Sequence, residues 1–192
     1  MTDTQMEIRF DKACSNYIPN HELGTVMHQN LEKFGLPVYE EAEREFAVEI
    51  YEQITKEDKE NTINEIEKSS GVSVTEEGPF LTKVIPYQKT KEVLFGSSDV
   101  GDVSWVVPTA QFWGGSFVFG TPLHSWQLVA QGATGIAHKG MLQAAKTLAG
   151  TAVEILLDAD ILERAKGEFV EKRRGLDNEC PIPKGVTLSP LK

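Results

Sequence analysis

The first patterned segment of the chain alternates apolar and charged residues. Between Thr4 and Ala13, the apolar side chains of Met6, Ile8 and Phe10 are separated by single charged residues. A period of two predicts a β-strand with one buried and one solvated face. The first half of the chain offers no set of strands that this one could join. We therefore expect its partner strands to come from elsewhere and the chain to be a piece of a larger unit.

Helical spacing replaces this alternation from residue 20 onward. Asn20 is a good N-cap and Gly35 a typical helix stop, so a first helix is expected between them. A second helix is predicted from about 41 to 54, and a third from about 55 to 68, where a Thr-x-x-Asp pattern resembles a capping box. The third helix has few apolar residues and is expected to be peripheral.

The centre of the chain, from Gly96 to Trp126, contains two apolar runs rich in Val, Phe and Trp. They cover 103–112 and 116–119 and are bounded by Gly and Pro, a composition typical of buried strands. Residues 80–87 can form a strand or an extended connection, and the proline within them favours a sheet edge.

Two further helices are predicted in the second half, at about 137–159 and 161–173. The first has a wide apolar face that is rich in small residues, which let a helix pack closely on a sheet. This face consists of Met141, Ala144, Ala145, Leu148, Ala149, Ala152, Val153 and Leu156. Buried strands in the centre and helices before and after them are typical of an α/β fold.

Candidate functional residues lie in the loops beside the predicted central strands. His124 follows a Gly-Thr-Pro turn, where a neutral imidazole can serve as a metal ligand or as a hydrogen-bonded surface residue. Asp99 and Asp102 can ligate a metal, orient a histidine, accept hydrogen bonds from a substrate, or simply cap a turn by bonding nearby amides. His138, at the start of the long helix, can face the same pocket or have no role in a site.

Composition and charge exclude several classes of function. The chain has 192 residues and a formal net charge of -10, which disfavours nucleic-acid binding and docking on anionic lipid. No segment is apolar enough to span a membrane, and residues 1–20 carry charges throughout, so no signal peptide is predicted. Cys14 and Cys180 lie far apart without a paired spacing, which predicts free thiols in a reducing cytoplasm.

The usual catalytic signatures are missing from the sequence. There is no GxSxG elbow, P-loop, HExxH pair or dinucleotide fingerprint. A hydrolytic metal site needs at least three protein ligands and an open position for water, and this chain offers one convincing ligand. We therefore expect no complete catalytic site in the chain by itself.

Specific motifs nevertheless resemble those of a known family. The chain is similar to the C-terminal part of the B-type subunits of p-aminobenzoyl-glutamate hydrolase, a group within the M20 family of metallo-aminoacylases and carboxypeptidases. The likeness covers nearly the whole chain. It is carried by Phe10 to Ser15, Tyr17 to Asn20, Ser98 to Trp105, Gly120 to His124, Ala137 to Met141 and Cys180 to Lys184.

The resemblance implies a two-domain arrangement of which this chain holds a part. M20 enzymes have an α/β catalytic domain, a mixed sheet flanked by helices, with an inserted lid domain that mediates dimerisation. Residues 1–18 then resemble the last strand of the lid, and 19–192 the C-terminal half of the catalytic domain. Residues 39–95 are the expected branch-specific insertion.

The same resemblance implies a metal-dependent hydrolase that cleaves an amide next to a free carboxylate, with two zinc or manganese ions. By motif, His124 matches the final metal ligand, while Asp99 and Asp102 match an acidic loop that lines the site. Most of the family's ligands and its general-base glutamate lie in the N-terminal half, which this sequence lacks. The chain is therefore expected to be inactive alone and to need the missing half or a second subunit.

A second hypothesis is a non-catalytic module that associates with itself or binds a partner. The alternating first strand could pair with its copy in a homodimer and so close an exposed edge. Retention of Asp99, Asp102 and His124 favours the enzyme hypothesis, because a purely structural remnant has no need of them.

Overall fold

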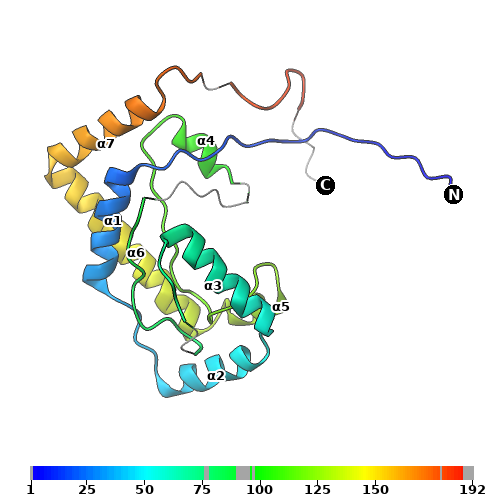
Figure 1. Cartoon of the computed structure of the whole chain (residues 1–192), viewed down its shortest axis with the longest axis vertical. Helices are drawn as coiled ribbons and strands as arrows, with labels where there is room; N and C mark the ends of the chain where they lie inside the picture. Colours follow the sequence, from blue (N-terminus) through cyan, green and yellow to red (C-terminus); the bar gives the residue numbers. More distant parts are fainter. Residues whose placement is uncertain (1, 76–77, 90–95, 97, 178, 188–192) are drawn as a thin grey trace.

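The computed structural model describes residues 2–75, 78–89, 96, 98–177 and 179–187, and its regular elements in these ranges are all helices (Figure 1). In chain order the helices are α1 (His21–Phe34), α2 (Glu41–Glu52), α3 (Lys56–Ser70), α4 (Val100–Ser104), α5 (Trp126–Gln131), α6 (Gly135–Leu157) and α7 (Ala159–Lys172). No helix in these ranges is long and apolar enough to cross a membrane.

The first helix confirms the ends predicted from the sequence. The Asn20 side chain accepts a hydrogen bond from the Leu23 N–H at 3.0 Å, and Gly35 ends the helix with a φ of 70°. The amide of Asn20 also donates to the Ala165 carbonyl oxygen of α7, at 2.8 Å. One residue thus caps α1 and holds it against α7, and α1 lies alongside α6 as well (Figure 1).

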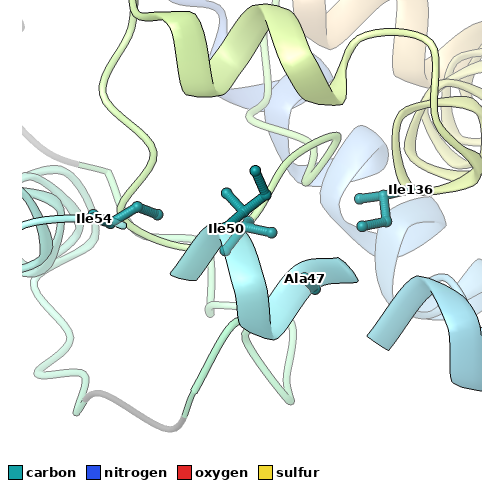
Figure 2. Close-up of a cluster of buried hydrophobic side chains, with 5 residues drawn as sticks. Ala47, Ile50, Ile54 and Ile136 are labelled. Atoms are coloured by element: carbon teal, nitrogen blue, oxygen red, sulfur yellow. The ribbon is translucent and has the colours of Figure 1, made fainter. Parts of the chain in front are cut away.

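A small apolar core forms where α2 and the residues just after it meet the loop before α5 and the first turn of α6 (Figure 2). It consists of Ala47, Ile50, Ile54, Val118 and Ile136. The stacked rings of Tyr39 and Phe80, whose centroids lie 4.1 Å apart, pack against it. The predicted start of α3 at Thr55 is confirmed, because the Thr55 hydroxyl accepts from the Asp58 N–H.

The predicted α/β fold is wrong, since no strand or sheet is present in the described ranges. Residues 4–13 are extended, but Met6 and Ile8 are 84% and 81% exposed. Alternating residues fit one face of a sheet, but a strand also needs a neighbouring backbone with which to share hydrogen bonds. No described segment provides that neighbour, so the mixed sheet expected of an M20-type catalytic domain is not found.

The two central apolar runs also differ from the prediction. Val103 and Ser104 belong to the short helix α4, and the residues that follow form a turn. In the second run, Val118 donates its N–H to the side chain of Gln131, and Phe119 donates to the Pro79 carbonyl. The backbone amides of these residues therefore make separate hydrogen bonds to different partners, and not the repeated hydrogen bonds of a β-ladder. Residues 80–87 likewise form no strand.

The long helix α6 and its neighbour α7 are confirmed to within a few residues of the predicted ends. Only Asp158 separates them, and its side chain accepts from the Asp160 N–H as the N-cap of α7. The predicted packing of α6 on a sheet is wrong, because its apolar face is largely exposed. The division at residue 18 and the insertion at 39–95 stay predictions.

Candidate functional site

The acidic motif predicted to line a site folds into the short helix α4. Asp99 occupies the N-cap position with its side chain exposed and without a capping hydrogen bond. Asp102 lies within the helix, and its Oδ1 accepts a hydrogen bond from the Ser15 N–H at 2.9 Å. Hydrogen bonds from Ser15 hold the pKa of the Asp102 carboxyl below its usual value. The bond from the Ser15 side chain has the larger effect and the bond from its backbone the smaller one.

Two more residues of the motif bind the same extended segment. The Ser104 hydroxyl accepts from the Ile18 N–H at 2.8 Å and donates to the Gly101 carbonyl at 2.5 Å. The indole Nε1 of Trp105 donates to the Asn16 carbonyl at 2.8 Å. Asp102, Ser104 and Trp105 therefore hold residues 15–18 along α4 through backbone groups.

Contact between these two segments is close at Gly101. A Cβ added to Gly101 would lie 2.1 Å from the Ser15 carbonyl oxygen, a distance that real side chains do not adopt. The glycine of the Asp-Val-Gly-Asp motif is thus required by the approach of the backbone of residue 15.

Three of the sequence motifs meet around one hollow beside α4. Its volume is about 240 Å³, and it is lined by Ala13, Ser15, Asp102, Cys180, Pro181 and Ile182. Although these residues are far apart in the chain, all belong to the motifs that carry the family resemblance. Sequence analysis missed this meeting point, because nothing in the local pattern of the Pro-rich tail indicates where it lies.

His124 lies on a second, separate loop, and its side chain is exposed. Its φ of 60° places a non-glycine residue in the left-handed region, shortly after Gly120, whose φ is 81°. A side chain adopts this conformation seldom, and such positions gather at functional sites.

Gln131 fixes the loop that leads to His124, and sequence analysis did not identify it. Its side chain is fully buried; its Oε1 accepts from the Val118 N–H at 2.7 Å. Its Nε2 donates to the Thr121 hydroxyl at 3.1 Å and to the Gln127 carbonyl at 3.0 Å. The only sequence signal is a helical glutamine directly before a glycine, which is too common to predict such a role.

His138 lies near the start of α6, as predicted, and its side chain is exposed. Its neighbour Lys139 is anchored to α2, with its Nζ 2.6 Å from a carboxylate oxygen of Glu43. This ion pair and a hydrogen bond from the Glu40 amide lower the pKa of Glu43. The first turns of α6 are therefore fixed to α2, while the imidazole of His138 remains accessible.

The predicted site residues are not brought together into one cluster. Figure 1 shows α4, which contains Asp102, well separated from α5, which begins two residues after His124. Within the described part of the chain, no three His, Cys, Asp or Glu side chains are grouped so that they could hold a metal ion. These residues therefore do not fit a complete metal centre on their own.

Comparison with known proteins identifies a hydrolase subunit as a relative. The chain is 46% identical, over its whole length, to the B-type subunit of p-aminobenzoyl-glutamate hydrolase from Escherichia coli (strain K12). The predicted resemblance to this group of subunits is thereby confirmed. The chain spans about two fifths of that relative, since the match covers 41% of it. No protein-family model matches the chain, and no solved structure matches it.

Proposed function

We propose that the chain is one portion of an amidohydrolase similar to p-aminobenzoyl-glutamate hydrolase, which cleaves an amide bond next to a free carboxylate. The observation that carries this proposal is the identity of 46% across the whole chain to a hydrolase subunit. We further propose, because of the motifs described above, that the chain belongs to the wider M20 family of metallopeptidases. The two free cysteines support the proposal that it resides in a reducing cytoplasm.

Catalysis in this proposal requires polypeptide from outside the chain. The described residues gather no group of three metal-ligating side chains, whereas a hydrolytic metal site needs at least three and an open position. The relative is more than twice as long as the segment that this chain matches. The remaining ligands and the general base would come from that remainder, joined to this chain or supplied as a separate subunit.

His124 is the proposed contribution of this chain to a zinc or manganese site. Its imidazole is exposed, and its backbone is held in a left-handed conformation on a loop that Gln131 fixes. The backbone that carries this ligand therefore loses little conformational freedom when a metal and the other ligands arrive. Asp99, Asp102 and His138 are proposed only as residues near the assembled site.

Metal content and hydrolysis together test this proposal. The chain would be combined with the unmatched remainder of the E. coli relative, and zinc and manganese per complex would be measured beside hydrolysis of p-aminobenzoyl-glutamate. We expect His124→Ala to lower both readouts, while His28→Ala, which removes an imidazole from α1, leaves both unchanged. A complex that binds no metal and hydrolyses no amide would overturn the proposal.

A second candidate function is a non-catalytic module that associates through its N-terminal segment. The exposed apolar side chains of Met6, Ile8 and Phe10 on an extended segment favour it, because such a segment can pair with its copy. Light scattering at micromolar concentration tests it. A dimer that becomes monomeric in Ile8→Lys, but not in Arg9→Lys, would support self-association, and a monomeric wild-type chain would exclude it.

A further inference from the structure

The longest helix of the chain packs through its less apolar side. The residues of α6 that are buried are Ile136, Gly140, Gln143, Thr147 and Thr151, which recur at helical spacing on one face. Four of these five are polar residues or glycine. This is the reverse of an ordinary surface helix, whose apolar stripe faces the core.

The buried polar face is held by specific contacts with α1 and with the helix itself. Gln143 donates its side-chain amide to the Gly35 carbonyl. Thr147 and Thr151 donate to the carbonyls four residues before them, at 3.0 and 2.8 Å. These bonds satisfy the buried hydroxyls and leave them no need of solvent.

The backbone of α6 also approaches α1 closely at Gly150. A Cβ at that position would lie 2.3 Å from Oδ1 of the buried Asn30. A rotation of α6 that turned its apolar residues toward α1 would break this close fit and the bond from Gln143. The observed orientation is therefore fixed by α1, and the apolar residues are left facing outward.

The outward side is apolar over most of the helix. We define the α6 apolar face as Met141, Leu142, Ala145, Leu148, Ala149, Ala152, Val153 and Leu156, all of which are exposed. Met141 is 59% exposed, Leu148 51% and Leu156 84%. None of these eight residues is charged, the exposed Lys146 borders Leu142 and Ala149 along one edge, and the alanines allow a flat surface to approach the helix closely. A patch of this kind marks an interaction surface.

We propose that the α6 apolar face is the surface on which the remainder of a complete hydrolase polypeptide docks. This inference rests on the proposed function. It adds the location of the contact between this chain and the remainder of the enzyme. The relative to which the chain is 46% identical has more than half of its length outside the match. It therefore carries a large body of polypeptide that this chain would contact in a complete enzyme. The uncharged face requires an apolar partner surface.

His138 gives the docking surface its connection to the candidate site. It precedes Met141 by three residues and Leu142 by four, so it lies on the same side of α6 as the apolar face, at its N-terminal end. A polypeptide that covers the face would border this exposed imidazole.

Charge introduced into the middle of the face tests the proposal. The chain and its Ala145→Lys and Ala149→Lys variants would be titrated with the remainder of the E. coli subunit, with Ala42→Lys as control. Ala42 is an exposed helical alanine on α2, outside the face. Circular dichroism and thermal unfolding should be unchanged in all variants, because each substituted residue is exposed.

We expect both face variants to weaken binding by at least about 100-fold, since an unpaired charge would be buried in an apolar interface, and the control to bind like the wild-type chain. Equal binding by the face variants and the wild-type chain, with hydrolysis intact, would overturn the docking surface alone. Face-dependent binding without hydrolysis would overturn the proposed function alone. No binding by the wild-type chain would overturn both.

One further outcome concerns a different occupant. A dimer of the wild-type chain by itself that Ala149→Lys converts to a monomer would assign the face to a second copy and overturn docking of the remainder. Binding of the wild-type chain, but not of Ala149→Lys, to neutral phosphatidylcholine vesicles would assign it to a lipid surface and overturn the proposal equally.

Discussion

Asp102 and Ser15 are 87 positions apart in the chain, and the Asp102 carboxylate accepts a hydrogen bond from the Ser15 N–H at 2.9 Å. This bond joins two motifs that the sequence presents as unrelated. Asp102 thus has a structural partner. The capped-turn alternative expected this partner to be a backbone amide close in sequence, whereas the amide that Asp102 binds is distant. If Asp102 takes part in an assembled site, it does so with a carboxylate whose orientation is already fixed by the Ser15 amide.

Removing this carboxylate should release the segment around Ser15. We expect Asp102→Ala to increase hydrogen exchange at the Ser15 amide, and Asp102→Asn to do so less, because the amide oxygen of asparagine can still accept the bond. Exchange measured by NMR at that amide is the readout. Unchanged protection in Asp102→Ala would show that the bond does not hold the segment.

Acid should weaken the same attachment. The pKa of Asp102 is lowered from its ordinary value of 3.8, so the folded state binds a proton there less readily than the unfolded state does. The stabilisation is therefore complete above about pH 4 and is lost as pH falls through the lowered pKa. Exchange at Ser15 in wild-type protein should accelerate below that range relative to Asp102→Asn, and parallel profiles would contradict this assignment.

Two glycines should respond oppositely to alanine. Gly101→Ala would place a Cβ 2.1 Å from the Ser15 carbonyl oxygen and should destabilise the protein by about 1 to 3 kcal/mol, as overpacking does. Gly167→Ala, inside α7, where an added Cβ would meet no atom within 4 Å apart from its own helix backbone, should stabilise it by up to about 1 kcal/mol. Urea unfolding of both variants measures the difference. Equal effects would show that contact at Gly101 is not tight.

Gln131 should be required for the loop that carries His124. Gln131→Leu replaces the amide by an apolar side chain of similar size and leaves the Val118 N–H without its partner. We expect a loss of about 1 to 3 kcal/mol in the free energy of unfolding. Gln127→Leu, on the same helix, should cost much less. The loop variant should also weaken metal binding by the assembled complex, since His124 would lose its fixed position.

His21 should titrate at lower pH than an ordinary histidine. Burial first, and then the positive charge of Lys172, lower its pKa from 6.5, although the carboxylate of Glu168 opposes this effect. Its Nδ1 lies 2.8 Å from the Tyr87 hydroxyl. Because the unfolded state binds the proton more readily, stability should fall as pH drops from about 6.5 through the lowered pKa.

Thermal unfolding at pH 7.5 and 5.5 measures that dependence. The wild-type protein should lose more stability between the two values than His21→Ala does. A titration midpoint at or above 6.5 by NMR would contradict the prediction.

What the sequence predicted correctly was local. Asn20 and Gly35 define the ends of α1, and Thr55 the start of α3, because a cap depends on residues within one turn. The strands failed because the apolar runs at 103–112 and 116–119 carry strand composition without information about a neighbour. Pairing depends on a second backbone, and the described chain gives Val118 a glutamine side chain instead.

The roles of the candidate site residues stay predictions. The structure exposes the side chains of His124 and His138, and it places Asp102 elsewhere, against Ser15. The orientation of α6 explains why the prediction that its apolar face packs on a sheet is wrong. A helix rich in Met, Leu and Ala predicts a buried face, and only the contacts of Gln143 and Gly150 with α1 show that the other side is the one covered.

Hydrolysis of p-aminobenzoyl-glutamate is the most direct test of the central claim that this chain is one part of an amidohydrolase. It would be assayed with added zinc or manganese for the chain alone, for the remainder of the E. coli subunit alone, and for the two combined. We predict hydrolysis only in the combined sample, and its loss with His124→Ala. A combined sample that forms a complex but releases no glutamate, or a chain that hydrolyses the substrate equally well alone, would contradict the account.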